Sequence, residues 1–148
     1  MSNELDRYRT FLADEDPLVI AVLKGHLVLE SLLEEILGGL TDRGDLLTSA
    51  ANTFHRKRLV AQAHAGVRSD DDAWVLLQKI STLRNEIAHN LESAKLDTML
   101  GEISHTLEGR DPSAYQLIPD PHDRVQLISH SVAFLIGFLQ GYRRDTTA

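Results

Sequence analysis

Residues 71–91 read DDAWVLLQKISTLRNEIAHNL, and their pattern decides the fold class. Apolar side chains recur every three or four positions, which is the spacing of one face of an α-helix. Ser69 and the aspartates at 70–72 supply an N-cap and an acidic first turn, which the helix dipole favours. The sequence therefore predicts a helix whose buried stripe comprises Ala73, Leu76, Ile80, Leu83, Ile87 and Leu91.

Three polar residues stand near the end of this helix. Asn85 and His89 are i,i+4 neighbours and share the face opposite the buried stripe. Arg84 borders the stripe and lies about 140° around the helix from His89, at roughly 100° per residue. One helix therefore does not gather the three groups into a pocket, but a second copy of it could complete one. We expect Glu30 to be the anion that pairs with Arg84.

The rest of the chain predicts an all-α protein: an up-and-down helical bundle of about five to six helices. We expect residues 1–148 to form a single domain, with residues 1–16 as an N-terminal helix or arm and residues 143–148 as a frayed tail. Residues 41–52 are predicted to be a connection that can include a helical turn, and 108–121, with three prolines, an ordered loop. The remaining helices are expected at 3–13, 17–38, 54–66, 93–108 and 121–142.

The helix at 17–38 begins with a break and restart at Asp16 and Pro17, because proline suits the first turn of a helix. Its core stripe is predicted to include Leu18, Val22, Leu29, Leu33 and Ile36. His26 and Glu30 lie four residues apart on the margin of that stripe. A carboxylate at the edge of a core needs a partner, so both residues are candidates to support the site near Arg84.

The last helix is almost entirely apolar. Small residues recur every four positions along it, which predicts that another helix approaches closely, within the bundle or at a subunit interface. These residues are Ser129, Ala133, Gly137 and Gly141. The segment is short for a membrane span and contains polar residues, and the N-terminus is too polar and acidic for a signal peptide. We therefore expect a cytoplasmic protein without a membrane partner.

The composition limits the chemistry. Hydrophobic residues make up 43% of the chain, which is enough for a core, and the absence of cysteine excludes thiolate nucleophiles and disulfides. The net charge of -7 implies no broad basic surface, so RNA could be met only at a local basic patch. The most basic segment contains Arg56, Lys57 and Arg58. It is either a solvated helix face or a place where a phosphate backbone docks.

Motifs for cofactors and metals are missing from the sequence: it has no GxGxxG, no phosphate-binding loop and no HExxH, and its histidines lack metal-ligand spacing. We expect no cofactor and no metal. Arg84, Asn85 and His89 remain, and this set suits RNA cleavage by the 2′-hydroxyl of the RNA itself. Histidine can act as general acid or base near neutral pH, arginine can stabilise the charge on the phosphorane, and asparagine can orient the phosphate.

The octapeptide LRNEIAHN at 83–90 resembles the Arg-polar-x-x-x-His signature of the HEPN superfamily. The layout is similar as well: a long helix with an inward glutamate, VLKGHLVLESLLEEIL, precedes a shorter one, FHRKRLVAQAHAG, and then the motif helix. Within the superfamily the chain looks most like the mannitol operon repressor-like and toxin-like small stand-alone members. The resemblance covers roughly residues 17–107.

The resemblance implies a homodimer in which the two motif helices face each other across a two-fold axis. Many members are metal-independent endoribonucleases that act as toxins or in phage defence. On this basis Arg84 and His89 would be catalytic, Asn85 supportive, RNA the substrate, and an antitoxin or regulatory protein a further partner. In one toxin branch a tyrosine two residues after the histidine receives a nucleotide. Leu91 stands at that position here, so this form of regulation is not expected.

Three interpretations of the motif remain open. The main hypothesis is a HEPN ribonuclease with a composite site at the dimer cleft. The second is a non-catalytic dimeric regulator or protein-interaction module of the same fold, which the acidic net charge favours. In the third the motif is structural: Arg84 pairs with Glu30, and His89 caps or packs.

Overall fold

The computed structural model describes Leu5 and residues 16–66, 71–90 and 94–147, and these residues form helices and no strand. The expected all-α class is therefore confirmed. The helices are α2 (Pro17–Gly39), α3 (Gly44–Ala50), α4 (Phe54–Ala65), α5 (Asp71–His89), α6 (Lys95–Arg110), α7 (Pro112–Gln116) and α8 (Arg124–Thr147).

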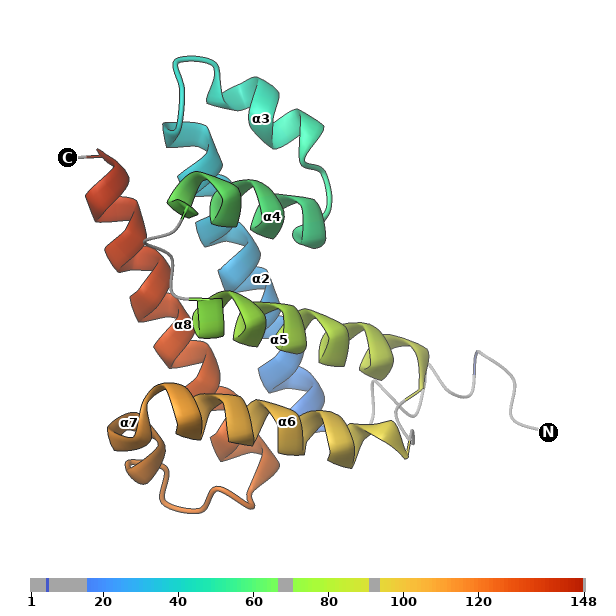
Figure 1. The fold of residues 1–148 in the computed structure, drawn as a ribbon. Helices are drawn as coiled ribbons and strands as arrows, with labels where there is room; N and C mark the ends of the chain where they lie inside the picture. The colour runs from blue at the N-terminus through green and yellow to red at the C-terminus, as the bar shows by residue number, and fades with distance from the viewer. Residues whose placement is uncertain (1–4, 6–15, 67–70, 91–93, 148) are drawn as a thin grey trace.

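The helices form two crossed layers (Figure 1). Helix α5 runs antiparallel to both α4 and α6, and the three helices lie across the pair formed by α2 and α8. Helices α2 and α8 run in the same direction, and residues 16–18 and 122–125 at their starts line one hollow. The predicted up-and-down order is therefore not followed throughout. After α6 the chain returns to the end of the molecule where α2 begins, so that α8 runs parallel to α2.

Local side-chain caps explain where the helices begin. The carboxylate of Asp16 accepts a hydrogen bond of 2.9 Å from the amide of Leu18, and Pro17 occupies the first turn of α2. At the start of α4, the hydroxyl of Thr53 accepts a bond of 3.2 Å from the amide of Arg56. The helix start predicted at Asp16 and Pro17 is therefore confirmed, while the residues before the break lie outside the described part of the chain.

The buried stripes agree with the periodicity of the sequence. Every described member of the stripe predicted for α5 is buried, and Leu91 lies outside the described residues. The five stripe residues predicted for α2 are buried as well. Trp74 adds to the core of α5: its ring is fully buried and meets Phe138 and Tyr142 of α8 edge-on, at centroid distances of 5.3 and 5.9 Å.

Helices α2 and α8 approach each other closely at Gly25. A Cβ atom there would lie 2.7 Å from a methyl group of Val132, which is closer than any real contact. The small residues predicted to allow this approach are on the other side of α8, since Ser129, Ala133 and Gly137 are exposed. The sequence analysis expected these small residues to contact a helix either within the bundle or in a second subunit. The first alternative is wrong, and the second stays a prediction.

Three segments are more helical than expected. Residues 44–50 of the predicted connection form α3, and residues 112–116 of the predicted loop form α7. Helix α7 begins because Pro112 occupies its first turn and the carboxylate of Asp111 accepts a bond of 3.0 Å from the amide of Ala114. Helix α8 continues to Thr147 instead of ending before the predicted frayed tail at 143–148. The helix expected at 3–13 and the cap at residues 69–70 lie outside the described residues.

Part of α8 also meets a simple criterion for a membrane span. Among the described residues, Arg124–Tyr142 is the stretch long and apolar enough, with a mean hydropathy of 1.2. A third of that window is buried in the bundle. Core helices of soluble proteins meet the same criterion. The finding is therefore compatible with the core helix that the sequence predicts for α8.

Candidate functional site

The motif residues lie on the last two turns of α5. Asn85 and His89 are exposed and Arg84 is half-buried, which is the arrangement predicted from the periodicity. The guanidinium of Arg84 donates a hydrogen bond of 3.3 Å from Nη1 to Oδ1 of Asn85. This bond is long, so it orients the two side chains weakly and leaves most donors of Arg84 for another acceptor.

Glu30 is bound by a lysine and not by Arg84. The ammonium of Lys57 donates to Oε1 of Glu30 at 3.0 Å and to Oε1 of Glu34 at 2.8 Å. The side chain of Lys57 is only 5% exposed, while those of the two glutamates are 31% and 45% exposed. The predicted pairing of Glu30 with Arg84 is therefore wrong, and the structural interpretation of the motif loses its ion pair.

The sequence contained one sign of this arrangement. Glu30 and Glu34 are four residues apart on α2, so they share a face and can hold one cation between them. Burial lowers the pKa of Lys57, but the hydrogen bonds that Lys57 donates to Glu34 and Glu30, together with the charges of both carboxylates, outweigh it and raise that pKa. Lys57 therefore stays charged inside the bundle.

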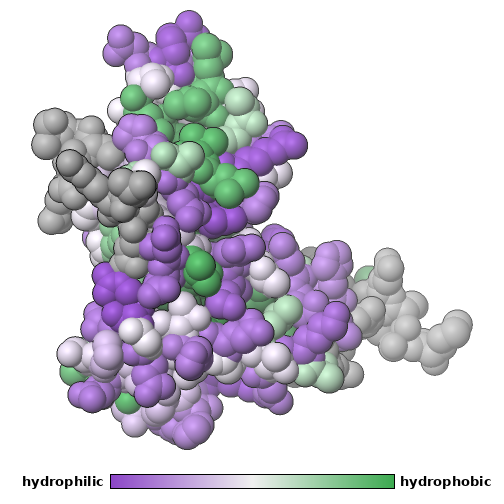
Figure 2. Space-filling model, viewed as in Figure 1, coloured by the Kyte–Doolittle hydropathy of each residue, from purple (hydrophilic) through white to green (hydrophobic). Residues whose placement is uncertain are grey.

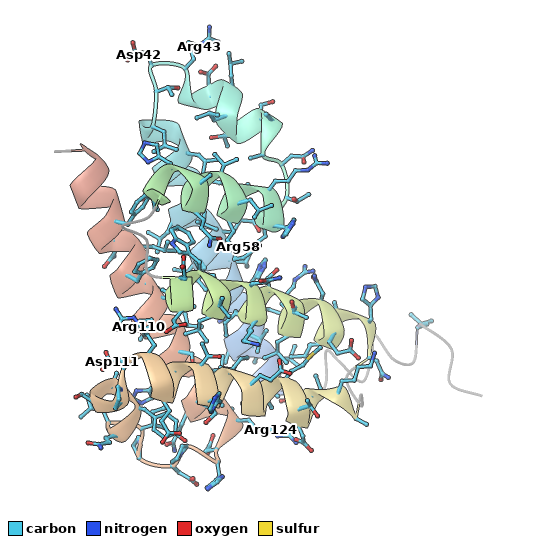
Figure 3. All side chains as sticks on the ribbon, viewed as in Figure 1. Asp42, Arg43, Arg58, Arg110, Asp111 and Arg124 are labelled. Carbon is cyan, nitrogen blue, oxygen red and sulfur yellow. The ribbon has the colours of Figure 1, made fainter. Side chains whose placement is uncertain are left out.

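The basic segment of α4 is mostly buried. Lys57 and Arg58 are 4% and 6% exposed, and Arg58 lies between α4 and α5 (Figure 3). Its guanidinium donates to Oε1 of Gln62 at 2.9 Å and lies 3.2 Å from Nδ1 of His55. Lys57 and Arg58 therefore form neither the solvated helix face nor the phosphate-docking surface that the sequence suggested. Arg56 is exposed and remains a candidate to contact RNA.

His26 joins this buried cluster from α2. It is 7% exposed, its ring lies 4.3 Å from the ring of Phe54, and its Nδ1 is 3.9 Å from Oε2 of Glu30. Burial lowers the pKa of His26, Glu30 opposes that shift, and the charges of Arg84 and Lys57 add to it. The imidazole is therefore neutral near pH 7, and the same ring is close to both Glu30 and Arg84.

A groove lies between α5 and α6, on the part of α5 that precedes the motif. Its volume is about 390 Å³, and it is lined by residues that include Val75, Gln78 and Thr82. Gln78 and Thr82 belong to the same exposed stripe of α5 as Asn85 and His89, at i, i+4, i+7 and i+11. The part of the molecular face in Figure 2 that lies over α5 and α6 is largely hydrophilic. In the part of the chain that the structure describes, no three acidic or histidine side chains could share a metal ion.

Comparison of the chain with known protein families, with curated proteins and with solved structures finds no match. What the site can do therefore follows from its residues: a cation whose one hydrogen bond to a described side chain goes to Asn85, that amide, and an exposed imidazole one turn further along α5.

Proposed function

We propose that the protein is a metal-independent endoribonuclease of the HEPN type that works as a homodimer in the cytoplasm, as a toxin or in phage defence. The observation that carries the proposal is the placement of Arg84, Asn85 and His89 together at the exposed end of α5. None of the three belongs to the core, so their side chains contribute little to the packing that holds the bundle together.

The reaction needs only groups that this site supplies. One His89 imidazole takes the proton from the 2′-hydroxyl, whose oxygen forms a bond to phosphorus while the bond to the 5′-oxygen breaks. A protonated imidazole, from His89 of the second subunit, gives its proton to the departing 5′-oxygen. The forked guanidinium of Arg84 donates to the non-bridging oxygens as negative charge develops on them. The products are a 2′,3′-cyclic phosphate and a 5′-hydroxyl.

The site is incomplete in one chain, because Arg84 and His89 are about 140° apart around α5. Helix α2 offers an exposed apolar stripe on which a second copy could pack. Ile20 and Leu27 are 37% and 65% exposed, and both lie within about 40° of Glu34 around the helix, on the flank that binds Lys57. We propose that a second chain packs on this stripe and that the dimer supplies the second α5.

Leu27→Asp is expected to raise the dissociation constant of the homodimer at least tenfold, because it places a charge in an apolar interface. Sedimentation velocity over a range of protein concentrations measures the effect. Leu117→Asp is the matched control, since Leu117 is 74% exposed at the end of α7. Equal association of the two variants would show that α2 does not form the interface.

The proposed activity is tested by incubating the purified protein with RNA in EDTA. We expect cleavage without added metal, with cyclic phosphate on one product and a 5′-hydroxyl on the other. RNA of the same sequence with 2′-O-methyl groups is the control, because it lacks the attacking hydroxyl and should stay intact. Cleavage of the methylated RNA, or intact unmodified RNA, would reject the mechanism.

A second candidate is a non-catalytic dimeric regulator or protein-interaction module. It is favoured by the net charge of -7 and by apolar residues gathered over α3 and α4 (Figure 2), the helices that carry the exposed Leu46 and Leu59. This candidate predicts a stable dimer that leaves RNA intact, and a partner such as an antitoxin that binds wild-type protein and His89→Ala equally.

A further inference from the structure

The groove between α5 and α6 has the charge of a site for an anion. Its volume of about 390 Å³ lies within the range of about 300–1,000 Å³ that is usual for clefts that hold small ligands. Its lining contains two lysines, Lys79 and Lys95, and one carboxylate, that of Glu102. The groove is therefore locally positive, although the net charge of the chain is -7.

The neutral part of the lining suits a nucleobase. Gln78 and Thr98 are exposed and supply an amide and a hydroxyl, which can exchange hydrogen bonds with the edge of a base. Val75, which is 39% exposed, and Met99 add apolar surface against which the flat side of a base can pack. A ligand that alternates phosphate groups with bases therefore matches both the charged and the neutral residues. A single strand of RNA is such a ligand.

The groove is aligned with the exposed imidazole of the motif. Gln78 and Thr82 of its wall lie about 20° to either side of His89 around α5, at roughly 100° per residue. Thr82 precedes His89 by about 10 Å along the helix, at a rise of about 1.5 Å per residue. Because α6 runs antiparallel to α5, the start of α6 with Lys95 lies beside the end of α5 that carries His89 (Figure 1). A strand in the groove therefore continues toward His89.

We propose that this groove binds the nucleotides of the RNA strand next to the cleaved bond, with the ammonium of Lys79 donating to a phosphate group. In the free protein Nζ of Lys79 pairs with Oε2 of Glu102 at 3.2 Å, between α5 and α6. The two side chains are 28% and 56% exposed, and ion pairs this open to solvent contribute little to stability. Lys79 can therefore exchange the carboxylate for a phosphate. The inference rests on the proposed function for RNA as the ligand.

The experiment measures the binding of fluorescein-labelled, single-stranded 2′-O-methyl RNA by fluorescence anisotropy at several salt concentrations. We expect Lys79→Met to raise the dissociation constant about fivefold or more, and to reduce its logarithmic salt dependence by about 0.7, as for one lost phosphate contact. Glu102→Gln should lower the dissociation constant about twofold or more, because it removes the competing carboxylate. Both variants lose the same ion pair, so a merely structural role of the pair would shift both in the same direction.

Arg43→Gln and Asp45→Asn are the matched controls. They remove the same charges from an exposed ion pair of 3.0 Å at the start of α3, at the opposite end of the molecule from α6 (Figure 3). Their dissociation constants should equal that of wild type within experimental error. Equal effects of the groove variants and the controls, shifts of both groove variants in one direction, or a wild-type protein that does not bind the RNA would each overturn the inference.

Cleavage of unmodified RNA by the same variants separates this inference from the proposed function. The full binding pattern together with intact RNA would reject the ribonuclease and keep the groove as an RNA site. If wild type and Lys79→Met cleave equally fast at RNA concentrations below saturation, the ribonuclease stands and the groove does not hold its substrate.

Discussion

His89→Ala is expected to lower the rate of RNA cleavage by about 10²- to 10⁴-fold, which is the usual contribution of a general acid or base. Its side chain is exposed on α5 and lies outside the packed core, so the thermal unfolding curve should stay within experimental error of wild type. The measurement is the initial rate of cleavage in EDTA, together with the unfolding curve followed by circular dichroism.

His105→Ala is the matched control for this prediction, because His105 is also an exposed histidine, on α6. It removes the same imidazole from the same kind of surface and should leave the rate unchanged. Equal rates for His89→Ala and wild type would assign the cleavage to a contaminating nuclease or to another site. Loss of activity in both variants would point to an effect on the surface as a whole.

Arg84→Ala is expected to reduce cleavage by about 10²- to 10³-fold while lowering the free energy of unfolding by less than about 1 kcal/mol. The guanidinium is half-buried and forms its described hydrogen bond with exposed Asn85, so its removal leaves no buried charge unpaired. The adjacent Leu83→Ala provides the contrast. Leu83 is fully buried, and its truncation should cost about 2–5 kcal/mol.

Urea unfolding measures the free energy of unfolding of the two variants and so distinguishes a loss of activity from a loss of stability. If Arg84→Ala were as destabilising as Leu83→Ala, Arg84 would be a structural residue and the third interpretation of the motif would be correct. A stable Arg84→Ala protein with wild-type activity would instead remove Arg84 from the reaction and leave His89 without its cation.

Features that depend on a single helix, such as which of its faces is buried, were predicted correctly from the sequence. The stripe from Ala73 to Ile87 is buried, and Asn85 and His89 point outward, because a helical period alone decides which face meets the core. The partner of Glu30 depends on two other helices. It was missed because three consecutive basic residues indicate a surface, whereas the packing of α4 on α2 buries Lys57 and Arg58.

The close contact between α2 and α8 was missed for a similar reason. The repeat of small residues on α8 indicated a contact face, but the structure places the contact at Gly25, a single glycine on the partner helix. Small residues permit close approach without requiring it, so the pattern could not say which face of α8 is used. The order of the helices, with α2 parallel to α8, is likewise set by tertiary packing.

The position of Trp74 gives this chain a built-in optical reporter. It is the one tryptophan of the sequence, and its indole is fully buried edge-on against Phe138 and Tyr142. Fifteen residues separate it from His89, which is about 22 Å along α5 at a rise of 1.5 Å per residue. Its fluorescence therefore follows the separation of α5 from α8 during unfolding, at the end of the helix remote from His89.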